Sequence, residues 1–223
     1  MKNKRAFWQS VVGIFGDSSP FMRKVEKLAL LAELNLCTLV CAFPVVTAGA
    51  AFTALHTVLL QFPSLTYGSA LGLYFRTFRQ AFRPTLPQWL LTLMAAIVLT
   101  GSWYIALHSQ LTDNFILMLP LLLSSAVVLF TAAWLYPLSA SLLASGEPLN
   151  FRDLLSGAVL LGLRELLRSF AACILILIPF LLLTFASLHS LTAMGVWMLF
   201  GITPFAYAHN ILTKNVITPK ESN

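Results

Sequence analysis

Long apolar runs separated by short polar or basic segments dominate the chain. The first run, Leu28 to Phe62, is longer than the roughly 20 apolar residues that one membrane-spanning helix needs. Pro44 and Gly49 interrupt it, because proline lacks an amide hydrogen and clashes with the preceding turn, while glycine accepts backbone angles that other residues avoid. The pattern predicts an opening hairpin over 28–62 with its turn at 44–49. Each arm is slightly short, so the hairpin either crosses the bilayer or re-enters it.

Residues 71–83 form the clearest amphipathic stretch. A helical rotation of about 100° per residue gathers the apolar side chains on one stripe and the basic ones opposite. The apolar stripe is Leu71, Tyr74, Phe75, Phe78 and Phe82, and the basic face holds Arg76, Arg79 and Arg83. We expect this segment to lie in the membrane interface, with the arginines contacting lipid head groups or a partner, and Pro84 and Pro87 to end it.

The remaining runs predict two further helix pairs. The second pair covers 86–143 and the third covers 170–212, with polar turns at 108–114 and 186–192. A basic segment at 149–168 separates the pairs, residues 1–27 read as an interfacial segment on the membrane surface, and 213–223 form a polar tail. The expected fold is therefore an all-α polytopic membrane protein in one domain, 1–223. It has about six membrane segments in three inner-to-outer hairpins, with amphipathic helices on the cytoplasmic side.

Composition excludes a soluble fold. Hydrophobic residues make up 58% of the 223 residues and charged residues only 10%, against about 25% charged in an ordinary soluble domain. The formal net charge is +6. Because the basic residues flank apolar runs, anionic membrane lipids rather than nucleic acid are the expected counter-charge.

The basic residues also predict an orientation. Of the 14 Lys and Arg residues, six precede Leu28, three lie in 71–83, three in 149–168 and two in the tail, and none lies in the three predicted turns. By the positive-inside rule, both termini and the basic segments face the cytoplasm. This requires an even number of crossings and supports counting the opening hairpin as two arms.

Three segments carry motifs: a Pro-x-x-Thr-x-Gly turn at 44–49, a basic-aromatic repeat at 75–83 and Tyr-Pro-Leu at 136–138. Together they resemble the YesL family of bacterial integral membrane proteins. The family pattern has an apolar run ending in Leu-Pro-x-x-Thr-x-Gly, followed by a small-residue helix with an Ala-Leu pair. Pro44, Thr47, Gly49 and the pair Ala54-Leu55 match it, whereas Phe43 replaces the leucine. A basic-aromatic repeat at 75–83 and the later motif at 136–138, Tyr-Pro-Leu, are also similar, so the resemblance extends over about residues 21–168.

The resemblance implies a bacterial cytoplasmic membrane location and an association with carbohydrate uptake or use. Since the family domain has no assigned biochemical function, it implies no catalytic residue.

Four polar residues of the opening hairpin are candidates for an intramembrane site: Glu33, Asn35, Thr47 and His56. An ionisable residue within hydrocarbon is costly and often functional. A structural interpretation stands beside each candidate. Glu33 would pair with Lys24, Lys27 or an arginine of 71–83, His56 would hydrogen-bond to Asn35 or Thr53, and Thr47 would bond to backbone freed by Pro44.

No motif indicates an enzyme, a cofactor or a metal. The nucleophile elbow, the zinc-protease motif and the phosphate loop are all absent, and Cys37, Cys41 and Cys173 lie within apolar runs without histidine at ligand spacing. We expect a non-catalytic accessory or scaffold protein, with transporter subunits or other membrane proteins as partners and homo-oligomers possible. The alternative is a small transporter or channel that uses the broken opening hairpin.

Overall fold

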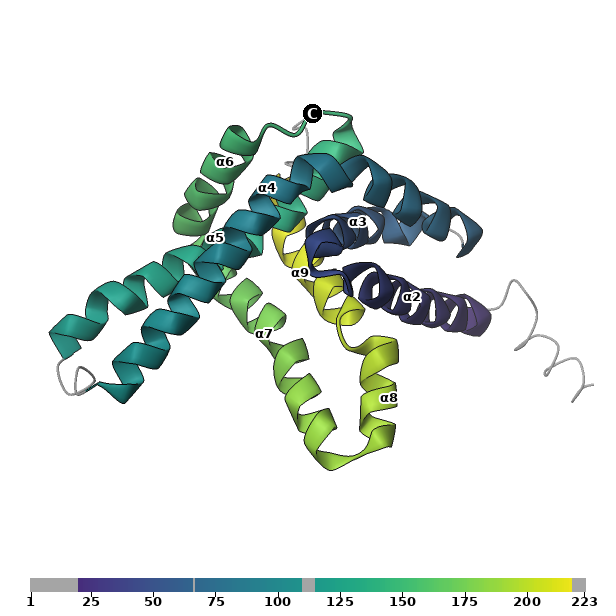
Figure 1. Ribbon diagram of the computed structural model, residues 1–223. Helices are drawn as coiled ribbons and strands as arrows, with labels where there is room; N and C mark the ends of the chain where they lie inside the picture. Colours follow the sequence, from purple (N-terminus) through teal and green to yellow (C-terminus); the bar gives the residue numbers. More distant parts are fainter. Residues whose placement is uncertain (1–19, 66, 110–114, 218–223) are drawn as a thin grey trace, which may run out of the picture.

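A computed structural model describes residues 20–65, 67–109 and 115–217. Residues 1–19 of the predicted interfacial segment, 1–27, lie outside the described residues, and 20–27 belong to the first helix described. The described part of the chain is helical, as the apolar runs predict (Figure 1). Its α-helices are α2 (Pro20–Ala42), α3 (Ala48–Gln61), α4 (Tyr67–His108), α5 (Phe115–Ser145), α6 (Phe151–Arg164), α7 (Leu166–His189), α8 (Leu191–Phe200) and α9 (Thr203–Ile217). Short 3-10 turns, η1 (Val45–Thr47) and η2 (Phe62–Ser64), flank α3.

Helix α3 is the centre of the packed core. Its residues from Ala48 to Leu59 are buried apart from Phe52, because α2, α4, α5 and α9 all pack against it. The small residues at its start allow this close packing. Leu34, Leu55 and Tyr74 join α2, α3 and α4 in one apolar cluster, in which each of them is fully buried.

The prediction that Pro84 and Pro87 end the amphipathic segment is wrong. Helix α4 continues through both prolines, and Figure 1 shows it changing direction between its two halves. Each proline removes a single ladder bond, and the buried residues Ala81, Thr85 and Gln88 hold the helix against its neighbours on both sides of the bend. The predicted apolar stripe is also rotated: Tyr74 lies at its buried centre, whereas Phe75 is 51% exposed.

Two apolar hairpins project from the packed core. The second half of α4 runs beside the first half of α5, and α7 runs beside α8 (Figure 1). Side chains such as Ile97, Leu107 and Leu181 are more than 60% exposed on these hairpins, which suits contact with lipid chains. Five segments of the described chain are long and apolar enough to cross a membrane: 45–64, 68–108, 118–145, 166–185 and 191–217.

The last apolar run is broken, which its hydrophobic pattern alone did not reveal. Helix α8 ends at Phe200, and α9 begins at Thr203. Pro204 lies in the first turn of α9, where its missing amide hydrogen is tolerated. Helix α5 ends at Ser145, and the next residue, Gly146, adopts a φ of 77° that favours glycine.

Candidate functional site

The turn of the opening hairpin lies against the middle of α4. Helix α2 ends at Ala42, just before Pro44, and the Thr47 hydroxyl donates to the carbonyl oxygens of Cys41 and Pro44. The predicted bonding of Thr47 to backbone at the turn is therefore confirmed. The Trp89 indole donates to the Val45 carbonyl oxygen at 2.5 Å.

Gly49 has a different role from the one its sequence position suggests. Among the described residues only Gly146 has positive φ, so Gly49 is not needed for an unusual backbone angle. A Cβ atom at Gly49 would lie 2.6 Å from the Trp89 Cβ atom. Glycine at position 49 therefore allows α3 to approach α4 closely.

Asn35 bonds to the break between α8 and α9. Its Oδ1 atom accepts from the backbone nitrogens of Ile202 at 2.9 Å and Thr203 at 3.0 Å, and from the Thr203 hydroxyl at 3.1 Å. Its Nδ2 atom donates to the Met198 carbonyl oxygen at 2.7 Å. In an unbroken helix the Ile202 amide would donate to the Met198 carbonyl. The side chain of Asn35 is inserted into this step of the ladder, and it satisfies both groups.

The sequence suggested a hydrogen bond from His56 to Asn35 or Thr53, but the structure shows a different partner. Its Nδ1 atom lies 2.6 Å from Oδ1 of Asn210, and Nδ2 of Asn210 donates to the His56 carbonyl oxygen at 3.0 Å. The reciprocal pair joins α3 to α9 in the core. His209 packs edge-on against the His56 ring, with centroids 5.4 Å apart. The partner was missed because Asn210 lies 154 positions away in the sequence.

Glu33 lacks the expected ion pair. Within the described part of the chain, the ion pairs are those of Glu165 with Arg164 and Arg168. One carboxylate oxygen of Glu33, Oε2, is buried without a hydrogen-bond partner. The structure therefore does not bring Glu33 together with Asn35, Thr47 or His56 in one polar site.

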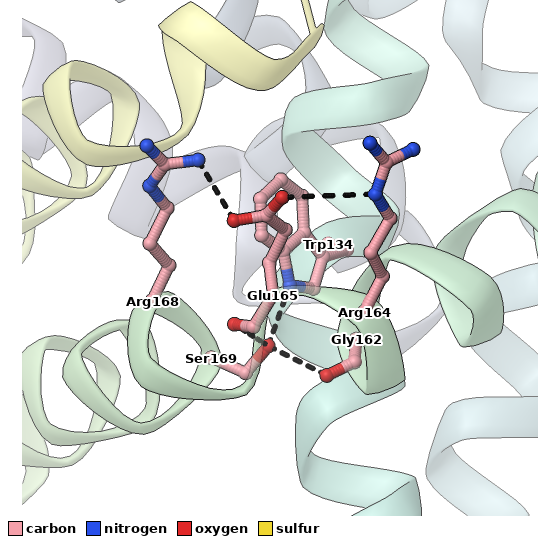
Figure 2. A network of polar contacts seen from close by, with 6 residues as sticks. All are labelled: Trp134, Gly162, Arg164, Glu165, Arg168 and Ser169. Atoms are coloured by element: carbon pink, nitrogen blue, oxygen red, sulfur yellow. Dashed lines mark hydrogen bonds and ion pairs between the residues drawn. The ribbon is translucent and has the colours of Figure 1, made fainter.

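Other buried polar side chains also bond across helices. Gln88 and Ser139 exchange hydrogen bonds of 3.2 and 3.3 Å between α4 and α5. At the corner between α6 and α7, the Trp134 indole donates to the Ser169 hydroxyl at 2.9 Å (Figure 2). That hydroxyl is in turn 2.9 Å from the Gly162 carbonyl oxygen, and Figure 2 shows Glu165 between its two arginines above this network. Such pairs are used to hold helices together in lipid.

The arginine face of α4 is exposed. Arg76, Arg79 and Arg83 are all solvent-accessible, and no acidic residue of the described chain pairs with them. Phe78 and Phe82 flank the last two arginines around a shallow open hollow. Arginines beside aromatic rings have the chemistry to bind anionic groups, and such pairs are typical of membrane interfaces.

An apolar cavity of about 290 Å³ lies between the two projecting hairpins. Its lining comes from α3, α4, α5, α7, the link Ile202 and α9. Polar residues at the wall include Thr92, Tyr136 and His209. None of the four sequence candidates lines it. Its lining residues are spread along the sequence from Phe52 to His209, so no single stretch of the chain indicates the cavity.

The polar side chains described above bond mainly to one another and to backbone groups across helices. The described residues contain no group of three or more metal-ligating side chains. The helix break could have been suspected from Gly201 and Pro204, the same kind of signal that located the opening turn.

No family model, curated protein or solved structure matches the chain.

Proposed function

We propose that the chain is a non-catalytic accessory or scaffold protein of the bacterial cytoplasmic membrane, with both termini in the cytoplasm. The observation that carries this proposal is how its polar groups are distributed. The interior amides and hydroxyls described above bond to each other, whereas three arginines on α4 are exposed without an acidic partner. The α4 face therefore presents three unpaired positive charges to other molecules, on the side that we propose is cytoplasmic.

The opening hairpin in this proposal re-enters the membrane rather than crossing it. Helix α3 has 14 residues and spans about 21 Å at 1.5 Å per residue, which is short of the roughly 30 Å hydrocarbon core. The turn touches Trp89, which lies closer along α4 to Arg83 than to His108. A re-entrant hairpin and four crossings by α4, α5, α7 and α8–α9 keep both termini on one side.

The partner we propose is a subunit of a solute-uptake system, and the resemblance to the YesL family favours carbohydrate uptake. A basic face with adjoining aromatic residues suits both anionic lipid head groups and an acidic surface of a membrane partner. Self-association is compatible with the same face.

The test compares a triple variant, Arg76→Ala, Arg79→Ala and Arg83→Ala, with a matched variant, Arg23→Ala, Arg152→Ala and Arg164→Ala. Both lose three exposed positive charges, but only the first loses the α4 face. Both variants should insert into membranes as the wild type does. The first should lose most of the protein and anionic lipid that co-purify with the wild type. Equal recovery from the two variants would refute the assignment to this face.

A second candidate is a small transporter. It is favoured by the broken α8–α9 segment and by the unpartnered Glu33 oxygen, since broken helices in transporters present backbone groups to substrates. Against it, Asn35 already occupies the backbone groups at the break. Flux of protons, ions or sugars in proteoliposomes, abolished by Glu33→Gln, would establish this function in place of the accessory one.

A further inference from the structure

The cavity between the projecting hairpins has the lining of a ligand site. Phe52, Leu175 and Phe205 supply apolar wall from three helices, and Phe180 lies at the wall with 60% of its surface exposed. The cavity thus adjoins the lipid-facing surface of α7. Its volume of about 290 Å³ is close to the lower end of the range for small-molecule sites, about 300 to 1,000 Å³.

Water is a poor occupant of most of this cavity. A buried water needs two to four polar partners, and away from the edge formed by Thr92, Tyr136 and His209 the lining residues are almost all aliphatic or aromatic. A charged occupant is also disfavoured, because no Lys, Arg, Asp or Glu lines the wall. The lining therefore selects a neutral, mainly apolar molecule.

Two polar ends at this wall have no partner. The Tyr136 hydroxyl and the Nε2 atom of His209 are buried without a hydrogen bond, and His209 as a whole is only 2% exposed. The Thr92 hydroxyl, also at the wall, donates instead to the Gln88 carbonyl oxygen at 2.8 Å. A buried polar group without a partner is unfavourable, and a ligand oxygen beside the wall would relieve it.

We propose that this cavity binds a small neutral lipophilic molecule that carries one hydroxyl or carbonyl group. Its apolar body fills the space between α4, α5 and α7, and its oxygen hydrogen-bonds to Tyr136 or His209. At about 30 Å³ per water-sized volume, the cavity holds about ten non-hydrogen atoms. This site is independent of the arginine face and of any protein partner.

The experiment uses the full chain in nanodiscs of zwitterionic lipid and a probe, decan-1-ol with a diazirine in the middle of its chain. After illumination, peptide mass spectrometry maps the adducts. We expect saturable labelling at Phe180 and Phe205 that excess decan-1-ol removes and excess decane leaves largely intact. Labelling of Ile97, which faces outward, should be unsaturable and provides the internal standard.

Two tyrosine variants separate binding from folding. Tyr136→Phe should weaken probe binding about two- to tenfold, the effect of losing one hydrogen bond, without lowering thermal stability. Tyr74→Phe is the matched control, because the Tyr74 hydroxyl is also buried without a partner but lies in the α2–α3–α4 cluster away from the cavity. It should leave probe binding unchanged.

A cavity-filling variant, Ala132→Phe, should abolish saturable labelling while leaving the Ile97 signal unchanged. Competition by decane as strong as that by decan-1-ol would identify the cavity as a crevice for lipid chains and overturn the proposal. Unchanged binding by Tyr136→Phe together with His209→Phe would overturn it as well.

Discussion

Replacing Asn35 with alanine is the sharpest test of how the core is held together. The change leaves four groups without their partner: the Met198 carbonyl, the Ile202 amide, the Thr203 amide and the Thr203 hydroxyl. Side-chain hydrogen bonds in a membrane protein average about 0.6 kcal/mol each, so four bonds amount to about 2.4 kcal/mol. If one of these groups stays buried without a new partner, it adds about 1 to 3 kcal/mol to this cost. We therefore expect Asn35→Ala to lower the free energy of unfolding by about 2 to 5 kcal/mol.

The assay is equilibrium unfolding in mixed micelles of mild detergent and SDS, followed by far-ultraviolet circular dichroism. Thr38→Val is the matched control. Thr38 is fully buried on the same helix, but its hydroxyl donates only to the Leu34 carbonyl oxygen one turn away. Its replacement should cost about 1 kcal/mol or less. If Asn35→Ala is no more destabilising than Thr38→Val, Asn35 does not hold the α8–α9 break together.

Three further predictions concern other parts of the fold. Gly49→Ala should destabilise by about 1 to 3 kcal/mol in the same assay, because its Cβ atom would displace Trp89; Gly72→Ala, where nothing lies within 4 Å, should not. Ser169→Ala should cost about 1 to 3 kcal/mol by leaving the Trp134 indole without its acceptor, and the cost should shrink in a Trp134→Phe background. A cysteine at Val46 in a cysteine-free protein should resist an impermeant maleimide added from outside; prompt labelling would mean that the hairpin crosses the bilayer.

The sequence predicted the features that depend on local chemistry. Helix α2 ends two residues before Pro44, which weakens the helical ladder there, and Thr47 bonds to the carbonyls at that turn because they lie within a few residues of it. The amphipathic stretch and the arginine face also follow from spacing along one helix. Pro84 and Pro87 were misread, since proline weakens a helix locally while tertiary packing decides whether the helix continues.

The long-range partners could not be predicted from one sequence. Asn35 bonds to residues more than 160 positions away, and His56 to Asn210 across 154 positions. Which polar groups meet depends on how α2, α3, α8 and α9 cross, and the apolar surfaces that set those crossings look alike in sequence. The cavity was missed for the same reason, because its wall is assembled from residues of several helices.

The most direct test of the proposed function is affinity purification of the tagged chain from its native membranes under mild detergent. Co-purifying proteins are quantified against a tagged, unrelated membrane protein. The accessory function predicts near-stoichiometric recovery of subunits of an uptake system, lost in the Arg76, Arg79 and Arg83 variant. Recovery of the chain alone, or only with copies of itself, would contradict it.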